Sequence, residues 1–108
     1  MRAGDWLVVS GQVGLAGGVI VEGGIEAETR QALANLVSVL ASEDASLADV
    51  VKTTVYLRHI ADYPVMNELY VEAFAGHRPA RSTVAVAGLP LGALVEIDAL
   101  AFTPPVGP

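Results

Sequence analysis

Residues 78–86 read Arg-Pro-Ala-Arg-Ser-Thr-Val-Ala-Val, and this segment organises the rest of the chain. Pro79 fixes the backbone where the segment begins, and the alternation from Ser82 to about Ala87 predicts a β-strand. Arg81 stands where this strand starts, and it is one of only six Lys and Arg residues in the chain. A guanidinium is a planar fork that binds a carboxylate through two parallel hydrogen bonds. We therefore expect Arg81 to bind a small carboxylate-bearing metabolite.

The chain has 108 residues, enough for one domain with a single modest core. It has no cysteine, which excludes a disulfide framework and a thiolate metal site. The net charge of −6 disfavours nucleic acid and anionic lipid as partners. No apolar run approaches the roughly 18 residues of a membrane-spanning helix. We expect a cytoplasmic protein that binds neither membrane nor nucleic acid, with no cofactor and, given only His59 and His77, no metal ion.

The amino-acid composition predicts an oligomer. Hydrophobic residues make up 53% of the chain and charged residues 17%, whereas charged residues make up about 25% of ordinary soluble domains. A chain this short has too little interior to bury so many apolar side chains. A second copy of the same chain is the expected cover for the excess.

Hydrophobic periodicity predicts the secondary structure. Strands are expected at residues 6–10, 19–21, 50–57, 82–87 and 94–102, with a tight turn at Gly11 and a hairpin marked by the glycine pairs at 17–18 and 23–24. One helix should begin near Ile25 and bury Leu33, Leu36, Val37 and Leu40. The other should begin after Asp62, end at Gly76, and bury Met66, Leu69, Tyr70, Ala73 and Phe74. A capping box is expected between Ser46 and Asp49.

This order predicts an α+β domain, with one sheet that carries two helices on one face. The other face should then make the contact between copies, through Val50, Tyr56, Leu94 and Leu100. If strands 82–87 and 94–102 form a hairpin with Ala87 opposite Ala93, Arg81 lies across from Ala99. Arg81 is then about 10 Å from Glu96 along the strand, so direct pairing within one chain is not expected.

Four further residues are candidates for the site. Glu96 stands between Val95 and Ile97, where an acidic side chain is unusual and could serve proton transfer. The alternatives are an ordinary glutamate on a strand face or a salt bridge to Arg81. Thr83 shares a face with Arg81, and Gly11 would let a ligand approach the main chain. Asn67 has an ordinary exposed helix position as its alternative.

Six segments, in order and over almost the whole chain, resemble the RidA/YjgF family: Ser10–Gln12, Gln31–Leu36, Asp49–Leu57, Asn67–Tyr70, Pro79–Val84 and Leu89–Ile97. The resemblance implies a single RidA-like domain over residues 1–103, followed by a flexible tail over residues 104–108. It also implies a chorismate-mutase-like fold, assembled as a homotrimer with ligand clefts between subunits.

The resemblance implies an activity as well. Members of the family hydrolyse reactive 2-enamines and 2-imino acids, such as 2-iminobutyrate or 2-iminopropionate, to 2-oxo acids and ammonia. Position by position, Arg81 matches the arginine that binds the substrate carboxylate, and Glu96 matches the glutamate beside the attacking water. Gly11 matches a main-chain contact, Asn67 a pocket asparagine, and Thr83 a position that is often cysteine.

The chain departs from the family pattern in its first residues. The family usually carries a Gly-Pro-Tyr-Ser type segment with a pocket tyrosine well before the Ser-Gly-Gln block, and here only nine residues precede Ser10. Either the start site is misplaced or the chain is a shortened member with a more open pocket. The loop before Pro79 also looks short. A trimer that binds small 2-oxo or imino carboxylates without turning them over is therefore the alternative function.

Overall fold

The structure, a computed structural model, describes residues 1–104, so most of the tail expected at residues 104–108 lies outside the described part. Its two α-helices are α1 (Gly24–Ala41) and α2 (Tyr63–Phe74). Its strands are β1 (Arg2–Ala3), β2 (Trp6–Val13), β3 (Leu15–Ala16), β4 (Val19–Ile20), β5 (Val50–Leu57), β6 (Ala80–Ala85) and β7 (Val95–Phe102). Short 3₁₀ turns lie at Leu47–Asp49, Ile60–Asp62 and Pro90–Gly92.

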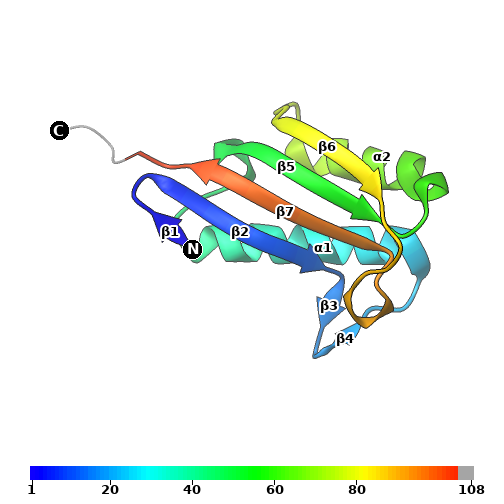
Figure 1. The fold of residues 1–108 in the computed structure, drawn as a ribbon. Coiled ribbons are helices and arrows are strands. Elements are labelled where there is room, and N and C mark those ends of the chain that lie inside the picture. Colours follow the sequence, from blue (N-terminus) through cyan, green and yellow to red (C-terminus); the bar gives the residue numbers. More distant parts are fainter. Residues whose placement is uncertain (105–108) are drawn as a thin grey trace.

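Five strands form one mixed sheet in the order β1-β2-β7-β5-β6, and β3 and β4 form a small separate hairpin. Only β5 and β6 run parallel; the other neighbours in the sheet are antiparallel. Figure 1 shows both helices behind this sheet, with its other face uncovered toward the viewer. The predicted α+β fold, one sheet with two helices on one face, is confirmed.

The core lies between the helices and the covered face of the sheet. Leu33, Leu36 and Leu40 of α1 are buried, but Val37 is 43% exposed, so its expected burial was wrong. Val37 instead faces a shallow groove between α1 and α2. The expected core residues of α2 and the inward row of β7 are buried or nearly so: Met66, Leu69, Tyr70, Ala73, Phe74, Val95, Ile97, Ala99 and Ala101.

The expected hairpin between β6 and β7 is wrong. β6 pairs in parallel with β5, where Arg81 lies beside Thr53, and β7 lies between β2 and β5. Two parallel neighbours need a crossover connection, and here the chain crosses from β5 to β6 through α2. This helix covers the apolar face of the sheet. On the side of β5, Ala99 pairs with Thr53, so one strand separates Arg81 from β7.

A tight turn was expected at Gly11, but strand β2 does not end there. It continues to Val13, with an irregular register between Val9 and Gln12. The turn comes later, at Gly17 and Gly18, whose φ angles of 61° and 82° favour glycine. The irregularity brings Val13 beside Glu96, so the end of β2 borders that carboxylate.

A second irregularity changes the faces of β5. The register with β7 shifts between Val50 and Lys52. As a result Val50 is fully buried in the core, and Val51 is 41% exposed. Val50 was expected on the uncovered face, so that assignment was wrong, whereas Tyr56 and Leu100 are half-buried on it. The capping box from Ser46 to Asp49 is present as predicted.

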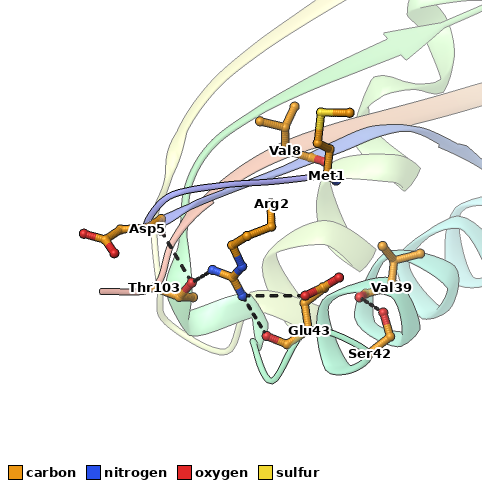
Figure 2. Close-up of polar contacts among 8 residues, drawn as sticks. All are labelled: Met1, Arg2, Asp5, Val8, Val39, Ser42, Glu43 and Thr103. Atoms are coloured by element: carbon orange, nitrogen blue, oxygen red, sulfur yellow. Dashed lines mark hydrogen bonds and ion pairs between the residues drawn. The ribbon is translucent and has the colours of Figure 1, made fainter. Parts of the chain in front are cut away.

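The first strand is tied to the far end of α1 by Arg2. Figure 2 shows its guanidinium between Thr103 and Glu43: it donates to Thr103 Oγ1 and, at 3.0 Å, to the carbonyl oxygen of Glu43. The Glu43 carboxylate lies 3.9 Å away, and Thr103 N donates to Asp5 O at 2.7 Å. These contacts join β1, the edge strand opposite β6, to the ends of α1 and β7. Within residues 1–104, neither helix is long and apolar enough to cross a bilayer.

Candidate functional site

Arg81 is held on the helix side of the sheet by residues of α2. Its Nη1 donates to Asn67 Oδ1 at 2.7 Å, and its Nη2 donates to Tyr63 Oη at 2.7 Å. Its Cζ lies 4.7 Å from the ring centroid of Tyr70 and 5.5 Å from that of Tyr63. Both distances fall within the range of cation–π attraction. The guanidinium therefore has a fixed orientation, as the sequence predicts for a ligand-binding arginine.

The ring of Tyr70 packs against the guanidinium of Arg81. It is 5% exposed, and its hydroxyl shares a hydrogen bond of 2.7 Å with Thr53 Oγ1. Burial raises the pKa of Tyr70, while the Thr53 hydrogen bond and the charge of Arg81 oppose the rise. The phenol stays neutral at physiological pH, and its ring face lies against the guanidinium.

Asn67 contacts Arg81, so its alternative as an ordinary exposed residue is wrong. Tyr63 was not among the predicted site residues, yet it supplies the second acceptor. A signal was available, because Tyr63, Asn67 and Tyr70 stand at i, i+4 and i+7 of one helix and therefore share a face. That face is the one turned toward Arg81.

A cavity of about 400 Å³ opens beside Arg81, at the short connection between α2 and β6. It is lined by Asn67, Tyr70, Val71, Arg78, Pro79 and Arg81. Its lining residues include two arginines, an asparagine and a tyrosine, and no acidic residue. Such a lining suits an anionic organic molecule.

Thr83 lies on the same side of β6 as Arg81, as expected, because it pairs with the buried Val55. Its Oγ1 is buried, and no group among residues 1–104 forms a hydrogen bond with it. An unpaired buried hydroxyl costs about 1–3 kcal/mol. This hydroxyl is therefore available to a ligand or to a neighbouring chain.

Glu96 lies on the opposite, uncovered face of the sheet. It alternates with the fully buried Val95 and Ile97, and it pairs with Tyr56 on one side and Val13 on the other. Gly11 lies directly beneath its side chain, since a Cβ built at Gly11 would be 2.4 Å from Glu96 Cδ. Gly11 and Glu96 thus form a second group of candidate residues.

A tyrosine–aspartate pair borders this second group. Tyr56 donates to Asp98 Oδ2 at 3.2 Å, and Asp98 Oδ1 accepts from Thr54 N at 3.0 Å. The negative charge of Asp98 is the largest cause that raises the pKa of Tyr56, and Glu96 adds to it. The uncovered face is therefore anionic around Glu96, and Tyr56 remains a hydrogen-bond donor.

The two groups do not meet within one chain. Arg81, Asn67 and Thr83 face the helices near the edge strand β6, whereas Gly11 and Glu96 face away from them. The ion pairs among residues 1–104 join Arg2 to Glu43 and Arg30 to Glu26, so the salt bridge between Arg81 and Glu96 is excluded there. The same residues contain no cluster of three His, Asp or Glu side chains that could hold a metal ion.

The chain is similar in sequence to a known protein family and to several of its named members. The family model described as Endoribonuclease L-PSP matches residues 1–103. A RutC family protein of Pyrococcus horikoshii is 42% identical over 94% of this chain and 82% of its own length. The 2-iminobutanoate/2-iminopropanoate deaminase of Rattus norvegicus is 43% identical over 92% of this chain and 74% of its own.

Solved structures share the fold. RidA from the Antarctic bacterium Psychrobacter sp. PAMC 21119 superposes with a TM-score of 0.91 at 34% identity, over 94% of this chain and 84% of that one. Yeast Mmf1 superposes with a TM-score of 0.92 at 34% identity, over 95% of this chain and 83% of that one. The sheet and both helices are therefore common to these proteins.

Proposed function

Because the chain belongs to the Endoribonuclease L-PSP family, also called RidA/YjgF, we propose that it hydrolyses reactive 2-enamines and 2-imino acids to 2-oxo acids and ammonia. Relatives about 40% identical are named 2-iminobutanoate/2-iminopropanoate deaminase. The substrates would be small imines such as 2-iminobutyrate or 2-iminopropionate. The cytoplasmic location stays a prediction.

The observation that carries this proposal is the fixed orientation of Arg81. A guanidinium has five N–H donors, and two of them are used by Asn67 and Tyr63. The remaining three suffice for a bidentate carboxylate with a donor to spare. Since the plane of the guanidinium is set before the ligand arrives, little orientational freedom is lost when a 2-imino acid binds.

A neighbouring copy would complete the site. The uncovered face of the sheet presents apolar side chains that a contact between copies would bury: Trp6, Val8, Val84 and Phe102. We propose a homotrimer in which Glu96 and Gly11 of one copy face Arg81, Asn67 and Thr83 of the next. This arrangement accounts for the position of the two groups on opposite faces of one chain.

The proposed chemistry needs only water. Arg81 binds the carboxylate, and the electrophilic imine carbon then faces a water molecule bound by Glu96. The carboxylate of Glu96 accepts a proton as the water oxygen adds to that carbon. Glu96 then gives this proton to the amino nitrogen of the intermediate, and the C–N bond breaks as ammonia leaves. The hydroxyl group of the intermediate loses its proton to Glu96 in the same step and becomes the carbonyl group of the 2-oxo acid. Because the imine is already reactive, orientation supplies most of the acceleration.

The wild-type protein is expected to accelerate ammonia release from 2-iminobutyrate generated in situ by threonine dehydratase. The comparison is with the spontaneous hydrolysis of the same imine in buffer, followed by continuous ammonia detection. An unchanged rate would reject the proposal. Calorimetric binding of 2-oxobutyrate without any acceleration would select the alternative, a trimeric binding protein that does not turn over its ligand.

Substitution of Gly11 by Ala is expected to lower the rate of imine hydrolysis about tenfold. The new Cβ would occupy the space 2.4 Å from Glu96 Cδ, so the flexible glutamate must rotate away from its position. Gly11 is exposed, and the thermal unfolding temperature should therefore change little. Gly88→Ala is the matched control, because a Cβ there meets no atom within 4 Å. Equal rates for the two variants would contradict the assigned role of Glu96.

A further inference from the structure

The cavity beside Arg81 is also lined by a second arginine, Arg78, which takes no part in the proposed hydrolysis. The two arginines line one cavity of about 400 Å³ together with Asn67, Tyr70, Val71 and Pro79. Only six Lys and Arg residues occur in the chain, whose net charge is −6. Within one chain, two of the six therefore meet where no carboxylate lines the wall. A local excess of positive charge in an acidic protein favours a ligand with more than one negative group.

Arg78 has unused hydrogen-bonding capacity. Its only hydrogen bond among residues 1–104 runs from Nη1 to His77 O at 3.3 Å. The ion pairs in that part of the chain involve Arg2 and Arg30, so Arg78 has no acidic partner there. Arg81 differs, because Tyr63 and Asn67 already fix it. Arg78 is thus an exposed cation on the cavity wall, free to turn toward a ligand.

The backbone that carries Arg78 is anchored on both sides. His77 N donates to Phe74 O at 3.0 Å. The distance between His77 Nε2 and Val50 O is 2.6 Å, within hydrogen-bonding range. Pro79 restricts the chain on the other side. Arg78 and Arg81 are three residues apart, at most about 10 Å between Cα atoms in an extended chain. Arginine side chains can bridge that separation to the two ends of a short diacid.

We propose that Arg78 binds a second carboxylate of the substrate, and that the site prefers dicarboxylic 2-imino acids and their 2-oxo products to monocarboxylic ones. The inference rests on the proposed function for the identity of the reacting group. The reaction itself is unchanged: the water oxygen adds to the imine carbon, the C–N bond breaks, and nitrogen leaves as ammonia. Both carboxylates emerge intact, one on Arg81 and the other on Arg78.

The test is calorimetric binding of 2-oxoglutarate and 2-oxobutyrate to the full-length assembled protein. The wild type should bind 2-oxoglutarate about tenfold more tightly than 2-oxobutyrate, the usual gain from one charge-assisted hydrogen-bonded pair. In Arg78→Gln this ratio should fall close to one, and in Arg78→Lys it should fall in between. Arg58→Gln, which removes an exposed arginine outside the cavity, should keep the wild-type ratio.

The inference is overturned if the wild type shows no preference, if Arg78→Gln keeps the preference, or if neither acid binds. The binding preference and the imine hydrolysis are measured separately, so either can fail without the other. Acceleration of 2-iminobutyrate hydrolysis without a diacid preference would remove the inference and leave the function. An Arg78-dependent preference without any imine hydrolysis would leave the inference and remove the function.

Discussion

Arg81→Ala is expected to lower kcat/KM for 2-iminobutyrate about a hundredfold, equivalent to ~3 kcal/mol of lost transition-state binding. The substitution removes the bidentate partner of the substrate carboxylate and leaves Arg78, which no side chain among residues 1–104 holds in place, as the cation in the cavity. Arg81→Lys should lose about tenfold, because a point charge keeps the attraction but not the planar fork. Initial rates of ammonia release at several imine concentrations measure both effects.

Arg30→Ala is the matched control for the loss of one arginine. Arg30 is exposed on α1, and its Nη2 lies 3.4 Å from Glu26 Oε1. Such surface pairs contribute at most about 1 kcal/mol to stability, and Arg30 does not line the cavity beside Arg81. Its removal should leave imine hydrolysis unchanged. If Arg81→Ala hydrolyses the imine as fast as Arg30→Ala, carboxylate binding by Arg81 is refuted.

The sequence predicted the parts of the fold that depend on local periodicity. The two helices and the inward row of β7 follow from the spacing of apolar residues, and burial of Leu36 and Ile97 is the direct consequence. The strand neighbours were not predictable in this way. A hairpin and a parallel crossover give β6 the same local pattern, and the choice depends on how α2 covers the sheet.

Where a strand is irregular, the alternation of apolar and polar residues did not predict the face of the sheet on which a side chain lies. Val50 is buried and Val51 exposed because the register of β5 shifts beside them. The same limit applies to β2, where the irregularity after Val9 places Gly11 beneath Glu96. The irregularity of β5 has no signal in the sequence, since bulges depend on the partner strand. That of β2 contains Gly11, and a glycine within a strand often marks a bulge.

The fixed orientation of Arg81 was easier to predict than its surroundings. A proline followed by an arginine at the start of a strand marks a fixed cation in an acidic chain, and the hydrogen bonds to Asn67 and Tyr63 agree. The separation of Arg81 from Glu96 was predicted for the wrong reason. It arises from opposite faces of the sheet and not from distance along a hairpin.

Arg81 and Glu96 lie on opposite faces of the sheet, so each proposed cleft takes one of them from each of two copies. Two variants that each lack one of these side chains should therefore regain activity when their subunits are mixed. In the proposed trimer, each of the variants Arg81→Ala and Glu96→Gln lacks one of the two catalytic side chains in every cleft. In a random equal mixture, a cleft is intact when the copy that supplies Arg81 carries Glu96→Gln and the copy that supplies Glu96 carries Arg81→Ala. Both conditions hold for about a quarter of the clefts, so about a quarter of the wild-type rate should return.

The mixture is prepared by unfolding the two purified variants together and refolding them, and its rate of ammonia release is compared with that of each variant refolded alone. Glu96→Gln mixed with Gly11→Ala is the matched control. Both of these residues lie on the same side of a cleft, so that mixture should never exceed the average of its two components. A mixture of Arg81→Ala and Glu96→Gln that stays at the level of its components would mean that each chain builds its site alone, and the proposed assembly would then be wrong.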